Sequence, residues 1–584
     1  MNTAVKPTAG TTELSQLIWR FLPLYKRAAL FSFVTSLLVL APTIFMLEVY
    51  DRVVNSRSST TLVMLIIWVL GTYLIMEWLD VVRGKLMYQA SEQFDVSLRK
   101  RLFNASFDAN LKNPNSGTLQ VFNDLRTLRD FIASPAVTSI MDAPASLLYL
   151  LIVFFISPWL GVVALIGAVV QVALGVQTER KTLPALTEAN KAAISAQNYA
   201  SGVLRNAQVV NAMGMTGHIH QRWMKRQRLF LAKQAEASDT AGINSASAKL
   251  IQMLQSSLIL GLSCWLTVKG MLLGGGGMMI VASTLGGRVL APLAQLILQW
   301  RLVVNARDSY RRMENFLNAL PERQYGMSLP APEGYLNVEQ VTAGAPGSPY
   351  PIIRGVNFSV APGETVAMIG PSAAGKTTLA RLLMGIWPSM SGKVRLDGND
   401  MYAWNKAELG PYLGYLPQDV ELFDGSIAEN IARFGDVDMD QVREAARQVG
   451  LDSMIEALPD SYDTLLGEDG ARLSGGQRQR VALARAIYGW PKFVLLDEPN
   501  SSLDEAGEKS LLETLLELKR RGSTTIIITH RTSVLPAADK ILILRDGQLA
   551  GFGPRDEVLA ALNKARQQQL AASGVPPQVA GGMA

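Results

Sequence analysis

Long runs without a charged residue dominate the first half of this 584-residue chain and constrain its fold more than any other feature. A helix needs about 20 apolar residues to cross a bilayer, and the uncharged runs are residues 28–47, 60–76, 143–176, 250–268 and 270–287. The run 143–176 is too long for one helix and is interrupted by Ser157-Pro158-Trp159, so we count two spans there. The last run continues past Arg288 to Trp300, and the total is six spans.

Lysine and arginine are distributed unevenly over the segments between these runs. Residues 81–138 carry eight of them and residues 177–248 carry nine, whereas the other three connections contain only Arg52, Arg57 and Lys269. Positive charge concentrates on the cytoplasmic side of membrane proteins. We therefore expect both long segments to face the cytoplasm, and an even number of spans places both termini there too. A buried soluble core, the alternative explanation of the apolar runs, needs no such asymmetry.

Composition agrees with a membrane protein. Hydrophobic residues make up 49% of the chain and charged residues 18%, which is too apolar for a soluble enzyme of this size. The single cysteine, Cys264, excludes an intrachain disulfide. The first apolar run is too long for the core of a signal peptide, so we expect an uncleaved anchor. The glycines of Gly274–Gly277 predict a short outer turn between the fifth and sixth spans.

The sequence changes character after about residue 325. Short β-rich runs such as ETVAMIG, FVLLDE and TTIIITH alternate with helical stretches, which predicts an α/β domain with a largely parallel sheet. The expected organisation is an N-terminal tail over 1–15, a six-helix transmembrane domain with cytoplasmic helix extensions over 16–324, a linker over 325–334, the α/β domain over 335–566 and a disordered tail over 567–584.

A phosphate-binding loop follows a predicted strand of the α/β domain. GPSAAGKTT fits G-x-x-x-x-G-K-T and comes directly after TVAMI, so backbone N–H groups can surround phosphates at a helix N-terminus. Lys376 is expected to reach the β- and γ-phosphates of ATP, and Thr377 to offer its hydroxyl to Mg²⁺. The predicted nucleotide-binding residues of this loop are Gly370, Pro371, Ser372, Ala373, Ala374, Gly375, Lys376, Thr377 and Thr378.

An acidic pair ends a second apolar strand in FVLLDEP, residues 493–499. Asp497 is expected to face the metal, and Glu498 to act as a general base that polarises the attacking water. The alternative is two surface carboxylates after a strand. The phosphate-binding loop upstream favours the catalytic interpretation.

LSGGQRQR, residues 473–480, resembles the signature of the ATP-binding-cassette (ABC) family at all five positions. GEDG (467–470) and SSLD (501–504) resemble further motifs of that family. The resemblance implies an exporter-type six-span domain followed by a P-loop cassette, working as a homodimer with ATP and Mg²⁺. It implies composite sites in which the P-loop of one subunit meets the signature of the other. The further site residues that it implies are Ser474, Gly476 and Gln477 for nucleotide, Gln418 for nucleotide and metal, and His530 as the catalytic switch histidine.

One position departs from the family pattern. The family stacks adenine on an aromatic residue about 30 positions before the P-loop lysine, and Ala345 falls at that place. Tyr350 is the nearest ring and is our candidate for the stacking residue. The alternative is an ordinary loop tyrosine.

The membrane half resembles bacterial type I protein-secretion transporters that export proteases, lipases and similar cargo. The matching stretches are MLEVYDRVVNSRSSTTL, LRTLRDFIASPA, RNAQVVNAMGM and GGRVLAPL, together with the lack of a peptidase-like domain before the first span. The resemblance implies an inner-membrane exporter of unfolded protein in a Gram-negative bacterium. Its partners would be a periplasmic membrane-fusion adaptor, an outer-membrane channel and a secreted protein with a C-terminal signal, with no nucleic acid. By analogy, LRTLRDF and RNAQVVNAMGM would each hold a short coupling helix.

Charged residues at two places in the membrane half are candidates for a translocation gate. Glu48, Asp51 and Arg52 lie at the outer end of the first span, where the alternative is a solvated loop tip. Arg288 lies inside a span, where an unpaired charge costs at least ~2.5 kcal/mol, so we expect it to line the translocation path. Pro292 would kink the same helix. The alternative for Arg288 is a structural pair with an acid such as Asp142.

Two other functions remain open from the sequence. A lipid or small-molecule exporter would share this architecture. A non-enzymatic ATP-binding regulator would share the spans, but the complete set of cassette motifs argues against it.

Overall fold

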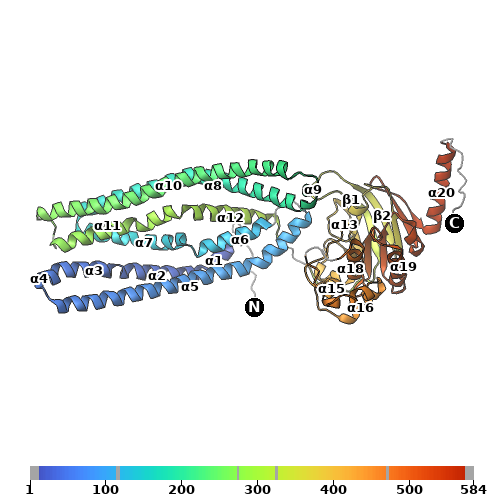
Figure 1. Cartoon of the computed structure of the whole chain (residues 1–584), viewed down its shortest axis with the longest axis horizontal. Coiled ribbons are helices and arrows are strands. Elements are labelled where there is room, and N and C mark those ends of the chain that lie inside the picture. The colour runs from blue at the N-terminus through green and yellow to red at the C-terminus, as the bar shows by residue number, and fades with distance from the viewer. Residues whose placement is uncertain (1–11, 113–118, 273–274, 323–325, 468–472, 573–584) are drawn as a thin grey trace. The chain divides into compact units, whose positions relative to one another are not determined.

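The computed structural model describes residues 12–112, 119–272, 275–322, 326–467 and 473–572. The chain divides into two compact units, one built from Met1–Asn110 and Pro114–Glu322, the other from Leu111–Asn113 and Arg323–Ala584. Within the described residues the first unit is helical, and the strands belong to the second unit (Figure 1).

Long helices lie lengthwise beside one another in the first unit (Figure 1). A π-helical turn over Val49–Val53 interrupts the first hairpin between α3 and α4. The helices are α1 (Glu13–Arg20), α2 (Leu22–Leu38), α3 (Leu40–Glu48), α4 (Val54–Ser56), α5 (Ser59–Lys112), α6 (Leu119–Ile132), α7 (Pro135–Ile156), α8 (Pro158–Leu204), α9 (Ala207–Ala212), α10 (Thr216–Val268), α11 (Gly275–Leu298) and α12 (Trp300–Ala319).

Six helical stretches of the described chain are long and apolar enough to cross a bilayer, which confirms the predicted number of spans. The break inside residues 143–176 also lies where the sequence predicts it. α7 ends at Ile156, Ser157 is extended, and α8 begins at Pro158. Proline suits this first helical position because the N–H that it lacks would have no partner within the helix.

The glycines of the predicted outer turn have a different role. Gly275 to Gly277 begin α11, so the prediction of a turn is wrong for them, and Gly274 lies outside the described residues. The chain bends earlier, at Gly270, whose φ is +70°. A Cβ on Gly277 would lie 2.8 Å from Oδ1 of Asp51. The missing side chain therefore lets α11 approach the π-helical turn closely.

Two sheets form the second unit. The larger sheet has the strand order β10-β9-β3-β8-β7-β6 and is parallel except for β10, which confirms the predicted largely parallel sheet. The smaller, antiparallel sheet has the order β2-β1-β4-β5 and was not predicted. The strands are β1 (Leu336–Ala343), β2 (Ile353–Val360), β3 (Thr365–Ile369), β4 (Ser391–Leu396), β5 (Asn399–Asp400), β6 (Leu413–Leu416), β7 (Phe493–Asp497), β8 (Thr524–Ile528), β9 (Lys540–Arg545) and β10 (Gln548–Pro554).

Helices surround the larger sheet (Figure 1). Every residue of β7 and β8 is buried, as expected for continuous apolar strands at the centre of a covered parallel sheet. The helices of this unit are α13 (Lys376–Leu383), α14 (Lys406–Leu409), α15 (Ile427–Ile431), α16 (Met439–Gln448), α17 (Asp452–Glu456), α18 (Gly475–Ile487), α19 (Glu505–Arg520) and α20 (Arg555–Ala572).

The predicted tails and linker differ from the structure at their edges. α1 begins at Glu13, inside the predicted N-terminal tail. α20 continues to Ala572, so the prediction of disorder is wrong for residues 567–572, and residues 573–584 lie outside the described part. The end of the predicted linker is held in place, because the amides of Glu333 and Gly334 donate to Oδ2 of Asp397 at 2.8 and 3.1 Å.

Candidate functional site

The phosphate-binding loop connects β3 to α13 and curls around its own lysine. Nζ of Lys376 donates to the carbonyl oxygens of Gly370 (2.9 Å) and Pro371 (3.0 Å). The loop needs small residues, since a Cβ on Gly370 would lie 2.2 Å from the carbonyl oxygen of Leu544. Gly375 adopts φ +96° directly before the helix begins. This geometry is typical of a loop that presents backbone N–H groups to phosphate.

The acidic pair lies at the carboxyl end of β7. Asp497 is 2% exposed, whereas the Glu498 side chain is 25% exposed. Glu498 has φ +51°, and its amide donates to the carbonyl oxygen of Ile528 at 2.9 Å. Asp497 therefore stays in the protein interior while Glu498 turns out of the sheet.

Electrostatics at this strand end favour a cation. Burial raises the pKa of Asp497, the charge of Glu498 adds to this shift, and a hydrogen bond from Thr377 opposes it, so that the pKa is raised to about 6. Oδ2 of Asp497 is buried and has no hydrogen-bond partner within the described residues. Burial also lowers the pKa of Lys376, although Glu498 and Asp497 oppose this shift.

Gln418 and His530 converge on Glu498. Nε2 of Gln418 donates to Oε2 of Glu498 at 3.3 Å, and Nε2 of His530 lies 3.3 Å from Oε1. Gln418 follows β6, Glu498 follows β7 and His530 follows β8. The three predicted residues meet because the carboxyl ends of adjacent parallel strands lie at one edge of the sheet.

The signature motif begins α18. Ser474 is the N-cap, and its hydroxyl accepts from the amide of Gln477 at 3.3 Å while Oε1 of Gln477 accepts from the amide of Ser474 at 2.8 Å. This reciprocal capping box defines where the helix starts. Gly476 packs against the backbone, since a Cβ there would lie 2.7 Å from the carbonyl oxygen of Ser502. Of the GEDG motif, residues 468–470 lie outside the described residues.

Gln479 is a site residue that the sequence reasoning missed. Its Nε2 donates to the carbonyl oxygen of Glu498 and to Oγ of Ser501, both at 3.1 Å. Its Oε1 accepts from the amide of Ser502 at 2.9 Å, and the residue is 4% exposed. The sequence did contain a signal for this role, because Gln479 is a polar residue on the same helix face as the apolar Ala482 and Ala486. Gln479 thus ties the signature helix to the segment that carries Glu498.

The loop between β1 and β2 holds Ala345 and Tyr350. Ala345 is half-buried, and its carbonyl oxygen accepts from the amide of Ser348 at 2.9 Å. Tyr350 is 78% exposed. The loop ends against the phosphate-binding loop, because Cγ2 of Ile352 lies 3.3 Å from where a Cβ of Gly375 would be. The Tyr350 ring is therefore largely exposed to solvent, and it lies two residues before Ile352, which contacts the P-loop.

The charged residues at the end of the first span belong to the π-helical turn and its flanks. Nε of Arg52 lies 2.9 Å from Oε2 of Glu48 in an exposed i, i+4 pair. Asp51 lies beside Gly277 at the start of α11. The hairpin is helical, its Asp51 and Arg52 side chains are exposed to solvent, and π-helical turns occur frequently at functional positions.

Arg288 does not form the pair with Asp142 that was the alternative explanation. Asp142 instead accepts from Nη1 of Arg83 at 3.0 Å, and Arg83 also donates to Oγ of Ser32 at 2.9 Å. Arg288 is exposed on α11 and has no hydrogen bond or ion pair within the described residues. Pro292 follows one turn later in the same helix.

The helix around Arg288 is bordered by side-chain amides. Nε2 of Gln255 donates to the carbonyl oxygen of Gly286 at 2.7 Å, and Nε2 of Gln252 donates to that of Gly287 at 3.3 Å. These bonds supply polar partners to backbone groups inside an apolar span.

The two stretches proposed as coupling helices differ in structure. RNAQVVNAMGM contains α9, a short exposed helix between the long α8 and α10. LRTLRDF lies inside α6, so it does not form a short helix of its own. Leu125 and Leu128 of this stretch are buried against α5 and α12. The six residues between α5 and α6 lie outside the described part.

The fold and the site define a class of protein: a helical membrane unit joined to a P-loop nucleotide-binding unit. The family profile described as "ABC transporter" matches residues 353–501, and the profile described as "ABC transporter transmembrane region" matches residues 28–287. The Type I secretion system ATP-binding protein PrsD of Rhizobium meliloti (strain 1021) is 38% identical over 538 residues, which cover 92% of each chain. The chain belongs to the ABC transporter family and is an ATP-hydrolysing transporter.

More distant relatives extend the comparison. The Leukotoxin translocation ATP-binding protein LktB of Mannheimia haemolytica is 28% identical over 93% of this chain and 77% of its own length. The Toxin RTX-I translocation ATP-binding protein of Actinobacillus pleuropneumoniae is 28% identical over 89% of this chain and 74% of its own. The structure of a bacterial Atm1-family ABC exporter with ATP bound has a TM-score of 0.80 at 23% identity, covering 93% of this chain and 99% of that chain. This last likeness establishes the exporter fold.

Proposed function

We propose that this chain uses ATP to export unfolded protein across the inner membrane of a Gram-negative bacterium as part of a type I secretion system. The observation that carries the proposal is the 38% identity to a type I secretion ATP-binding protein over 92% of both chains. The toxin-translocation names of the more distant relatives point the same way. The cargo would carry a C-terminal signal, and a periplasmic adaptor and an outer-membrane channel would complete the path.

The working unit of the proposal is a homodimer. One chain supplies a single P-loop and a single signature, whereas a composite site joins the P-loop of one subunit to Ser474, Gly476 and Gln477 of another. Ser474 and the following amides lie at the N-terminus of α18, where a helix end attracts anionic phosphate. Both termini and the ATPase unit would lie in the cytoplasm, beside the two basic segments.

The proposed cofactors are ATP and Mg²⁺, and the residues present fit both. Thr377 supplies a hydroxyl, and Asp497 supplies a buried carboxylate oxygen that has no hydrogen-bond partner in the described chain. Oxygen ligands of this kind suit Mg²⁺, which would neutralise phosphate charge during hydrolysis. Gln418, from the next strand end, is the third proposed ligand.

Hydrolysis in the proposal depends on Glu498. Its side chain is partly exposed and lies within hydrogen-bond reach of Gln418 and His530. Glu498 would orient a water and accept its proton, His530 would hold the carboxylate and contact the γ-phosphate, and Lys376 would move from its loop carbonyls to the phosphates. Tyr350 would cover the adenine from the β1–β2 loop.

A gate formed by Arg288 and Pro292, with Glu48, Asp51 and Arg52 at the outer end, would pass the cargo. Arg288 is exposed and has no hydrogen bond or ion pair in the described chain, which supports a role toward a cavity or a ligand. Replacing Arg288 by Ala should stop export while leaving the protein assembled in the membrane. Export at the normal level from this variant would contradict the gate.

The first experiment compares the culture-medium proteomes of cells that carry the wild type and Glu498→Gln. A few proteins with intact C-termini should vanish from the medium of the variant and remain inside the cells. Identical media would remove the protein-export proposal and favour the alternative, a lipid or small-molecule exporter, which is then tested with vesicle transport assays.

A further inference from the structure

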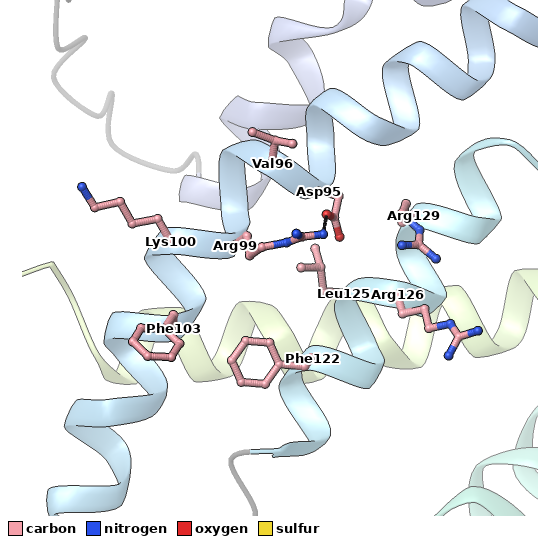
Figure 2. Close-up of a pocket in the computed structure, with 9 residues that line it drawn as sticks. All are labelled: Asp95, Val96, Arg99, Lys100, Phe103, Phe122, Leu125, Arg126 and Arg129. Carbon is pink, nitrogen blue, oxygen red and sulfur yellow. Dashed lines mark hydrogen bonds and ion pairs between the residues drawn. The ribbon is translucent and has the colours of Figure 1, made fainter. Parts of the chain in front are cut away.

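A pocket of about 780 Å³ lies between α5 and α6, is lined in part by the LRTLRDF stretch, and has no role in the proposed function above (Figure 2). Four of its lining residues are cations: Arg99 and Lys100 on α5, and Arg126 and Arg129 on α6. The only acid among the lining residues is Asp95. The pocket is therefore positively charged.

Lys100 keeps its charge available to a ligand, whereas Arg99, Arg126 and Arg129 are partly neutralised by neighbouring acids. Asp95 is 6% exposed and is paired with Arg99, which anchors that guanidinium. Arg126 and Arg129 share the carboxylate of Asp130, which does not line the pocket. Nε of Arg126 lies 3.9 Å from Oδ2 of Asp130, and Nη2 of Arg129 lies 2.9 Å from Oδ1. Lys100 is exposed and has no ion pair in the part of the chain that the structure describes.

Apolar side chains lie between the cations. Phe103 and Val96 are 56% and 66% exposed and share one face of α5 with Lys100. In Figure 2 the Phe103 and Phe122 rings stand at one end of the pocket, while Lys100 extends from the α5 side and Arg126 from the α6 side. A ligand that fits this lining carries negative charges and apolar groups together.

Position along α5 separates this pocket from lipid headgroups. The uncharged run of this helix ends at Met76, and Lys100 follows 24 residues later. At 1.5 Å per residue this is about 36 Å along the helix. The headgroup region on one side of a bilayer is only about 5–8 Å deep. The ligand therefore comes from the aqueous side rather than from the membrane.

Charge also argues against a second copy of this chain as the occupant. Residues 81–138 contain eight cations and five acids, and residues 177–248 contain nine cations and four acids. A copy that presented either segment to the pocket would bring like charges together, which costs binding energy. An acidic partner fits better.

We infer that this pocket binds an acidic segment of the exported polypeptide, one that also carries apolar side chains, before translocation. The inference rests on the proposed function. A volume of about 780 Å³ lies within the range of pockets that hold ligands. Rim cations that match acidic cargo speed its capture more than they raise final affinity.

The test uses the full-length protein in detergent at physiological ionic strength. The probe is a short fluorescein-labelled peptide of repeated Glu-Phe-Gly units, and the comparison peptide has Lys in place of Glu. Fluorescence anisotropy should show the acidic peptide binding about tenfold more tightly than the basic one. The double variant Lys100→Glu/Arg126→Glu should weaken binding of the acidic peptide about tenfold or more. The matched control is Lys225→Glu/Arg228→Glu on α10, which removes the same charge elsewhere and should change binding less than about twofold.

Unchanged basal ATP hydrolysis shows that the pocket variant is folded. Equal binding of the acidic peptide by wild type and pocket variant overturns the inference, and so does equal binding of the two peptides. A photoreactive benzoylphenylalanine at Phe103 that crosslinks to a second copy while the peptide is present also overturns it, because the face is then a subunit interface. The secretion comparison with Glu498→Gln separates the two proposals. If secretion is lost in Glu498→Gln but the wild type does not bind the acidic peptide, only the pocket inference fails and the proposed function stands. If the wild type binds the acidic peptide but secretion is unchanged in Glu498→Gln, the bound segment is not exported cargo.

Discussion

At the scale of single residues, Gln479 tests whether the position of Glu498 limits hydrolysis. Gln479 bonds to the backbone of Glu498 and to two residues of the following turn. Gln479→Ala should lower kcat for ATP hydrolysis about tenfold and leave KM within about twofold, because a small misplacement of a catalytic group costs rate rather than binding. Phosphate release by the full-length protein measures both values. Gln548→Ala, an exposed glutamine on β10, is the control, and an unchanged kcat in Gln479→Ala would contradict the positioning role.

Tyr350 carries the second prediction at this scale. Stacking on an aromatic ring contributes about 0.5–1.5 kcal/mol, so Tyr350→Ala should raise KM for ATP about two- to tenfold with kcat unchanged. Adding Ala345→Tyr to this variant should restore the KM, because it returns a ring to the place where the family has one. Tyr412, elsewhere in the unit, gives a control as Tyr412→Ala. A KM that stays at the wild-type value in Tyr350→Ala would leave Tyr350 a loop residue.

Motif residues could be predicted because their chemistry is local in the sequence. Lys376 and Glu498 follow directly from loop and strand patterns a few residues long. Gln479 escaped because its partners lie about 20 residues away, and only folding brings them together. The pair of Arg83 and Asp142 escaped for the same reason, because the two residues lie 59 positions apart and only helix packing decides which acid the arginine contacts.

At the scale of elements, one buried carboxylate ties α6 to α12. Asp124 is 1% exposed and accepts from Arg312 at 2.6 and 3.0 Å and from Ser309 at 3.0 Å. Arg312→Ala leaves this charge uncompensated and should destabilise the protein by about 3 kcal/mol, seen as a lower melting temperature. The neighbouring, exposed Arg311 provides the control Arg311→Ala. Adding Asp124→Asn to Arg312→Ala should restore part of the loss, and equal melting of the two single arginine variants would contradict the role of the pair.

Element boundaries were predictable where sterics act on neighbouring residues. Pro158 marks the start of α8 because proline suits the first turn of a helix. The role of Gly277 was not predictable, since it depends on how closely Asp51 approaches from another helix. The same limit applies to LRTLRDF, whose leucines repeat with a helical period but whose burial depends on α5 and α12.

At the scale of the whole molecule, the order of a six-span unit and an α/β unit followed from composition and periodicity alone. The antiparallel sheet of β2-β1-β4-β5 did not, because its strands pair across separations that no local pattern reveals. The uneven distribution of lysine and arginine over the segments between the spans is a property of the whole chain. It predicts which side of the membrane each segment faces, and chemical labelling can test this orientation.

That orientation carries the last prediction. Cys264 is the only cysteine, so Cys264→Ser gives a background without thiols. Lys269, at the end of α10, and Asn211, in α9, are both exposed, so a cysteine at either place can react. In spheroplasts, a membrane-impermeant maleimide should label Lys269→Cys at once and Asn211→Cys only after the membrane is permeabilised. The reverse pattern would place the basic segments outside the cytoplasm. It would contradict the prediction, based on their lysines and arginines, that residues 81–138 and 177–248 face the cytoplasm. The α10 helix joins both positions across one span, so equal labelling in intact spheroplasts would mean that this helix does not cross the membrane.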